Sequence, residues 1–248
     1  MGGSMKIDII SLFPDFIQAF YQHSIIGRAV ASGVIDLDVT NPRQFTYDRH
    51  RMVDDTLYGG GHGMLMKAAP LFTAVEVVRR SVEKRRIIFM GPTGCPFTQQ
   101  KARELATYDQ LILVCGHYEG VDYRVETELV DEVISIGDYV LTGGEIPAMV
   151  VTDAVVRMIP GVLGTHASAT DDSFYTSLLE CPQYTKPSIF RQWAVPDVLC
   201  NGDHKKIASW RRQASLQRTA MLRPDLLIHA SLTPQERLWL SSEKEEIE

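Results

Sequence analysis

The residues best suited to hold a ligand are glycines that follow strand-like segments. The apolar run Val133–Ile136 leads into a loop ending in Gly143 and Gly144, and a helix is expected to begin at Glu145, with proline in its first turn. Adjacent glycines expose bare main chain, and a helix N-terminus adds free N–H groups. This arrangement lets a small molecule approach the backbone closely.

Two other strand-like segments end in the same way. Arg86–Met90 runs into Gly91-Pro92-Thr93-Gly94, and Leu111–Cys115 runs into Gly116-His117-Tyr118-Glu119-Gly120. Open α/β sheets bind small molecules in the crevice beyond the carboxyl ends of their strands. We therefore expect the three loops to build one pocket.

A second candidate surface is the basic segment Lys205–Arg223, which contains no acidic residue. As a helix it would carry an apolar stripe made of Ile207, Trp210, Ala214 and Met221. Such a one-sided charge in an acidic protein favours phosphate contact over a merely solvated face. The cations assigned to nucleic-acid binding are Lys205, Arg211, Arg212, Arg218 and Arg223.

A third group of polar side chains lies in the long segment Asn41–Gly63, which exceeds the length of a passive connection and is expected to be a functional loop. His50, Asp54, Asp55 and His62 match no ligand spacing with a known rationale, so no metal site is predicted and they are assigned to the surface or to RNA.

Composition narrows the class of protein. The chain has 248 residues, 45% of them hydrophobic, which is enough for a globular core. No apolar run is long enough to span a membrane, and no secretory signal pattern is recognised. Its four cysteines form no Cys-x-x-Cys pair, which argues against a zinc site or a disulfide frame and fits a cytoplasmic protein. The net charge of −6 argues against a generally basic nucleic-acid binder.

The elements that must position these residues read as an α/β domain. A strand near Lys6–Leu12, one helix over Phe16–Ser32 stopped by Gly33, and a strand over Val34–Val39 come first. Helices and strands then alternate, which predicts a parallel sheet covered on both faces. The expected helices are 69–84, 99–107, 123–130 and 145–159, and the expected strands end at Met90, Cys115 and Val140.

The alternation stops at Pro160-Gly161, and only helical patterns follow Cys181. We divide the chain into an α/β domain at 5–164, a flexible linker at 165–176 and a small helical domain at 177–248, which carries the basic segment.

An ordered set of short motifs, spread from near Met5 to about Leu227, resembles the bacterial tRNA (guanine-N1)-methyltransferases. Ser135–Glu145 carries most of the resemblance. The other matching motifs are Ser11–Pro14, Asn41–Arg43, Val53–Asp55, Tyr58–Gly61, Gly63-Met64, Leu113–Gly116, Tyr118–Gly120, Ile159–Gly164, Asp172–Phe174, Cys181-Pro182, Trp210-Arg211 and Ser215–Thr219.

The resemblance implies a fold and an activity that composition does not. That family has an α/β knot of the SPOUT class, whose glycine loops thread one another to hold S-adenosylmethionine in a bent shape. Without it, the pattern alone predicts an unknotted doubly wound sheet. The implied enzyme is a homodimer with shared sites, and it methylates N1 of the guanosine immediately 3′ of the anticodon in tRNA when another guanosine precedes it, which prevents frameshifting.

The resemblance also implies site residues. Asp172 matches the base that removes the N1 proton of guanine, although Asp171 is chemically equivalent, and Arg157 matches the cation that stabilises charge at O6. His117 departs from the family, which commonly has arginine there. Mg²⁺ is associated with the family, but the sequence shows no cage for it. The cofactor-binding residues are Pro92, Gly116, Tyr118, Glu119, Ser135, Ile136, Gly137, Tyr139, Leu141, Gly143 and Gly144.

Two other functions stay open on the residues alone. A different nucleotide-dependent α/β enzyme is disfavoured because the chain lacks a Gly-x-x-x-x-Gly-Lys-Ser/Thr loop and a Gly-x-Gly-x-x-Gly turn after a strand. A non-catalytic RNA-binding protein would keep the basic helix and bind the ligand without turnover.

Overall fold

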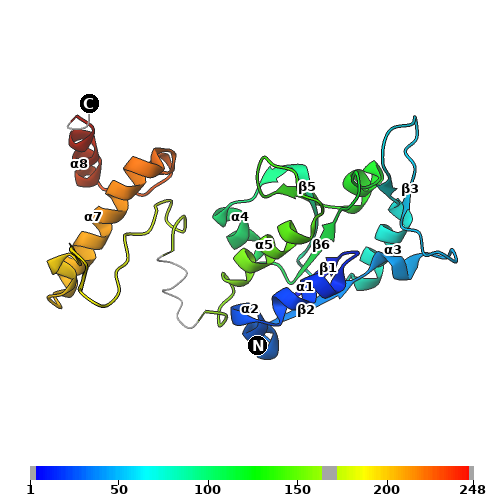
Figure 1. Cartoon of the computed structure of the whole chain (residues 1–248), viewed down its shortest axis with the longest axis horizontal. Coiled ribbons are helices and arrows are strands. Elements are labelled where there is room, and N and C mark those ends of the chain that lie inside the picture. The colour runs from blue at the N-terminus through cyan, green and yellow to red at the C-terminus, as the bar shows by residue number, and fades with distance from the viewer. Residues whose placement is uncertain (1–3, 164–171, 246–248) are drawn as a thin grey trace. The chain divides into compact units, whose positions relative to one another are not determined.

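The computed structural model describes residues 4–163 and 172–245 and separates the chain into two compact units, 1–166 and 167–248. The first unit contains a five-stranded sheet in the order β2-β1-β6-β5-β7, and every pairing in it is parallel (Figure 1). Its strands are β1 (Met5–Ile10), β2 (Ile35–Thr40), β5 (Arg85–Pro96), β6 (Gln110–Cys115) and β7 (Glu132–Ser135). The predicted parallel sheet is confirmed.

Helices cover both faces of this sheet because alternate residues of each strand point to opposite sides. Ile7 and Ile9 of β1 belong to a core cluster with α1, α2, α4 and α5, whereas Ile10 belongs to a second cluster with α3. The helices of this unit are α1 (Pro14–Tyr21), α2 (Ser24–Ala31), α3 (Ala68–Val78), α4 (Gln99–Leu105) and α5 (Glu145–Val156). A short hairpin of β3 (Asp54–Asp55) and β4 (Leu65–Met66) lies outside the main sheet.

Several predicted bounds are wrong for local reasons. The single helix expected over Phe16–Ser32 is two helices, because Ser24 adopts a left-handed φ of 59° between them. Gly33, with φ of 72°, does end the second helix as expected. The strand expected to reach Val140 stops at Ser135, and the helix expected near Tyr123–Val130 is a π-helical turn.

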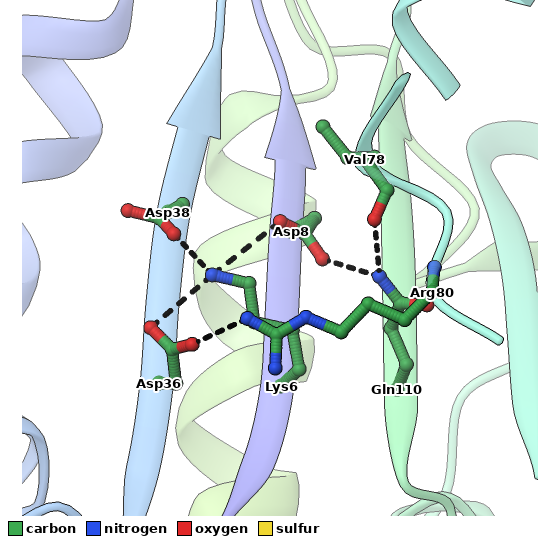
Figure 2. A network of polar contacts seen from close by, with 7 residues as sticks. All are labelled: Lys6, Asp8, Asp36, Asp38, Val78, Arg80 and Gln110. Atoms are coloured by element: carbon green, nitrogen blue, oxygen red, sulfur yellow. Dashed lines mark hydrogen bonds and ion pairs between the residues drawn. The ribbon is translucent and has the colours of Figure 1, made fainter. Parts of the chain in front are cut away.

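The third face-specific feature is a buried polar cluster in β1, shown in Figure 2. The ammonium of Lys6 contacts Asp8 at 3.6 Å, Asp36 at 3.2 Å and also Asp38. Gln110 donates to the Asp8 carboxylate at 2.6 Å. Lys6, Asp8 and Gln110 are almost fully buried.

Each charge in this cluster shifts its neighbours. Burial alone would lower the pKa of Lys6, but the hydrogen bond to Asp38 and the charge of Asp8 raise it above its ordinary value. Burial raises the pKa of Asp8, against the hydrogen bond from Gln110 and the charge of Lys6. The cluster therefore depends on Lys6 to compensate buried carboxylates.

The second unit is built around α7 (His204–Leu222) and α8 (Pro234–Glu245), with a small core of Leu178, Leu216, Ala230 and Leu240. Asp203 caps α7 by accepting from the N–H groups of Lys205 and Lys206. The prediction that no strand follows Cys181 is wrong, because β8 (Ile189–Phe190) and β9 (Trp193–Ala194) form an antiparallel hairpin. Of the predicted linker, residues 165–171 lie outside the described residues.

Candidate functional site

The carboxyl ends of β5, β6 and β7 carry the three glycine loops, and these loops line one pocket. Further lining comes from Phe89, His117, Thr142 and Pro147. All the residues that sequence analysis assigned to cofactor binding line it: Pro92, Gly116, Tyr118, Glu119, Ser135, Ile136, Gly137, Tyr139, Leu141, Gly143 and Gly144.

The loop after β7 turns sharply because Ser135 closes it. The Ser135 hydroxyl accepts from the N–H of Gly137 at 3.2 Å, and Gly137 has φ of 152°, a conformation that side chains disfavour. The Tyr139 hydroxyl donates back to the carbonyl of Ile136 at 3.3 Å. The strand therefore ends at Ser135 and the chain folds over the pocket.

The second glycine of the pair is needed for contact with β6. The N–H of Gly144 donates to the carbonyl of Gly116 at 2.8 Å. A Cβ on Gly144 would lie 2.7 Å from the Cα of Cys115 and 2.9 Å from the N of Gly116. Close approach of a ligand was the sequence-based reason for this glycine, whereas the structure shows close approach of two protein backbones.

A buried acid that sequence reasoning missed stands at the start of α5. Glu145 is 6% exposed and accepts from the hydroxyl of the buried Ser11 at 2.7 Å. A carboxylate in the first turn of a helix is favoured by the helix dipole. Burial, helped by the charge of Glu145, raises the pKa of the Cys115 thiol well above its ordinary value. The signal in the sequence was an acid directly after the glycine pair.

His117 brings an unpaired polar atom to the pocket. Its Nδ1 is buried and makes no hydrogen bond within the part of the chain that is described. Its ring packs edge-on against Phe13 and Tyr118, with centroids 5.0 Å away in both cases. Since buried polar atoms are normally paired, this nitrogen is available to a bound molecule.

The long loop expected to be functional packs against the pocket. Arg43 donates to the hydroxyl of Tyr118 at 3.2 Å, and the N–H of Glu119 donates to the carbonyl of Met64 at 3.1 Å. Gly63 lies so close to Glu119 that a Cβ would be 2.3 Å from its side chain. Arg43 had been noted only as part of a motif, without a role.

The pocket suits an adenosine-containing ligand with a positive charge. Apolar side chains such as Ile134, Ile136 and Leu141 can cover a flat ring, and the loops supply main-chain polar groups. Ser135 offers a hydroxyl for ribose, and the carboxylate of Glu119 complements a cation such as a sulfonium.

The predicted catalytic pair is divided between the two units. Arg157 follows α5 as its C-terminal capping residue, with its N–H bonded to the carbonyl of Asp153 at 3.1 Å. Asp172 belongs to the second unit, where its carbonyl accepts from the N–H of Tyr175 at 3.4 Å. Asp171, its chemical alternative, lies outside the described residues.

The basic residues of α7 fall into two groups. Lys205, Arg211 and Arg218 are exposed and make no ion pair with the described residues. Arg212 holds Glu236 through bonds of 2.7 and 3.2 Å, and Arg223 pairs with Asp225 at 2.7 Å.

The Arg212 pair joins α7 to α8 and lowers the pKa of Glu236 from 4.5 to about 2, chiefly through the side-chain hydrogen bond. The predicted apolar stripe is wrong at Met221, which is 69% exposed. The buried face contains Leu216 and Thr219, because the Thr219 and Ser215 hydroxyls bond to Leu179.

Metal ligation finds no support among residues 4–163 and 172–245, where no group of three or more His, Cys, Asp and Glu could hold an ion. Asp55 pairs with Lys67 at 3.5 Å instead. In the same ranges, no helix is long and apolar enough to cross a membrane.

The parallel sheet and its glycine-lined pocket define an α/β protein that binds a small-molecule cofactor beyond its strand ends. The family model of the tRNA (guanine-1)-methyltransferase TrmD matches residues 5–229, so the chain belongs to this family, which is of the SPOUT class. Proteins named tRNA (guanine-N(1)-)-methyltransferase from Bacillus cereus, Bacillus anthracis and Bacillus thuringiensis are 52% identical over 242 residues, which is 97% of this chain and 99% of each relative.

Proposed function

We propose that the chain transfers a methyl group from S-adenosylmethionine to N1 of the guanosine immediately 3′ of the anticodon in tRNA, within the cytoplasm, and so prevents frameshifting. The observation that carries the proposal is the single pocket lined by all three glycine loops at the strand ends. Membership of the family supplies the reaction and the tRNA substrate.

S-adenosylmethionine supplies an electrophilic methyl group on a sulfonium. The protein's task lies at guanine N1, which carries a proton near neutral pH. Asp172 accepts this proton, and the guanidinium of Arg157 stabilises the negative charge that spreads to O6. Glu119 balances the positive charge of the donor, and the apolar lining keeps water away from it.

The proposal includes a homodimer with a knotted cofactor domain and shared sites. One subunit contributes the pocket and Arg157, and the second unit of the other subunit contributes Asp172. Exposed apolar side chains on α1 and α5, namely Phe16, Ile146 and Val150, support a partner surface in the first unit. An isologous pairing would build two equivalent sites.

The base is tested by Asp172→Asn, which keeps the size of the side chain and removes its proton affinity. Turnover should fall by about 10²–10⁴, the usual effect of removing a positioned base, while calorimetry finds unchanged S-adenosylmethionine affinity. Asp171→Asn is the matched control and should stay active. If the two variants exchange behaviour, the base is Asp171.

The shared site is tested by refolding Arg157→Ala and Asp172→Ala subunits together. Each homodimer should be inactive, whereas a mixed dimer regains one complete site. Random pairing should restore about a quarter of wild-type activity, since half the dimers are mixed and each has one working site. No recovery, with mixed dimers confirmed by mass, would rule out the shared site.

A further inference from the structure

The β8–β9 hairpin has a surface that no role described above uses. Its two strands pair Ile189 with Ala194 and Phe190 with Trp193, so the two aromatic side chains stand directly opposite each other. Phe190 is 58% exposed and Trp193 59% exposed. Neither belongs to the hydrophobic core of the second unit, so core packing does not explain them.

Arg191 forms the tip of the hairpin between these rings. Its guanidinium carbon lies 5.4 Å from the centre of the Phe190 ring and 5.9 Å from that of Trp193, within cation–π range. Its φ of 57° is in the left-handed region, and glycine is usual at the first position of such a two-residue turn. A long cationic side chain at a position that favours glycine indicates a use for that side chain.

The charge around the hairpin has one sign. From Gln183 to Pro196 there is no acidic residue, and the cations are Lys186 and Arg191, although the whole chain has a net charge of −6. Every residue from 183 to 194 is exposed. The segment therefore offers flat apolar rings beside an accessible positive charge.

We propose that the hairpin Ile189–Ala194 binds single-stranded nucleotides of the tRNA substrate. A nucleotide matches both features, because its base stacks on an aromatic ring or a guanidinium plane and its phosphate pairs with a cation. A stable protein–protein interface takes about 20–30 residues a side, far more than this hairpin presents. The inference rests on tRNA being the substrate and on no assignment made for α7.

The test measures binding of unmodified tRNA by fluorescence anisotropy, with no methyl donor present. Trp193→Ala should weaken the affinity by about tenfold or more, within the range reported for removing a stacking ring. Trp193→Phe keeps a ring and should recover most of the affinity. Arg191→Lys keeps the charge, loses the planar guanidinium and should give an intermediate result.

Leu238→Ala is the matched control, since Leu238 is 74% exposed in α8 of the same unit and should leave tRNA affinity unchanged. If Trp193→Ala binds tRNA as tightly as Leu238→Ala does, the hairpin does not bind RNA. Loss of self-association by sedimentation with unchanged tRNA affinity would assign the hairpin to contact between chains and overturn the proposal. Because methyl transfer is not measured, failure of the hairpin leaves the proposed reaction untested by this result, and failure of the reaction leaves hairpin-dependent binding intact.

Discussion

Replacing Gly144 by alanine adds one methyl group where the loop after β7 touches β6. The new Cβ would lie 2.7 Å from the Cα of Cys115 and 2.9 Å from the N of Gly116. Both are main-chain atoms, so no side chain can rotate away. Restoring an ordinary contact of 3.4 Å requires the loop to move by about 0.7 Å.

This movement has a cost in stability and in binding. The hydrogen bond from Gly144 to Gly116, now 2.8 Å, would stretch to about 3.5 Å and be lost. Overpacking typically costs about 1–3 kcal/mol. We expect the free energy of unfolding to fall by about 2 kcal/mol, which lowers the urea midpoint by about 1 M. S-adenosylmethionine affinity should fall by at least about tenfold, because this loop is a wall of the pocket.

The matched control is Gly143→Ala. Its Cβ would meet the ends of side chains, 2.4 Å from Oε2 of Glu145 and 2.9 Å from Nδ1 of His117, and side chains can adjust more cheaply than backbone. The stability loss should therefore be smaller than at Gly144. A Gly144→Ala protein that keeps both the wild-type urea midpoint and the wild-type cofactor affinity would refute this account of the loop.

Three further outcomes follow from the side-chain contacts. Lys6→Met leaves Asp8 buried without its cation and should cost about 3 kcal/mol in urea unfolding, whereas Arg80→Met, at the exposed edge of the cluster, should cost less than about 1 kcal/mol; equal losses would contradict the burial argument. Because Arg212 lowers the pKa of Glu236 to about 2, the stability advantage of wild type over Glu236→Gln should be complete above pH 4.5 and shrink as the pH falls toward 2; a difference independent of pH would show that the pair does not stabilise the unit. Arg211→Glu with Arg218→Glu should weaken tRNA binding and lower its salt slope by about one for each phosphate contact, and an unchanged slope would return these residues to a solvated face.

The sheet could be predicted because parallel strands are buried on both faces and read as continuous apolar runs. Gln110–Cys115 is fully buried, and its boundaries match the expected strand closely. The glycine loops were placed correctly at one pocket because parallel strands bring their carboxyl ends to the same edge. Which ligand those residues bind stays a prediction.

Other features depend on backbone conformations and long-range contacts that a local pattern does not contain. The break before α2 rests on the left-handed φ of Ser24, a residue with no turn signal of its own. The β8–β9 hairpin has strands of two residues, too short to show alternation. Met221 was assigned to the core side by helical periodicity, but hydroxyl bonds from Ser215 and Thr219 orient α7 differently.

The central claim is methyl transfer to guanine N1 beside the anticodon. The most direct measurement incubates the protein with radiolabelled S-adenosylmethionine and unmodified tRNA and then identifies the labelled nucleoside after digestion. We predict label in 1-methylguanosine, and none when the guanosine 3′ of the anticodon is replaced by adenosine. Label in any other nucleoside, or in the adenosine-substituted tRNA, would contradict the account.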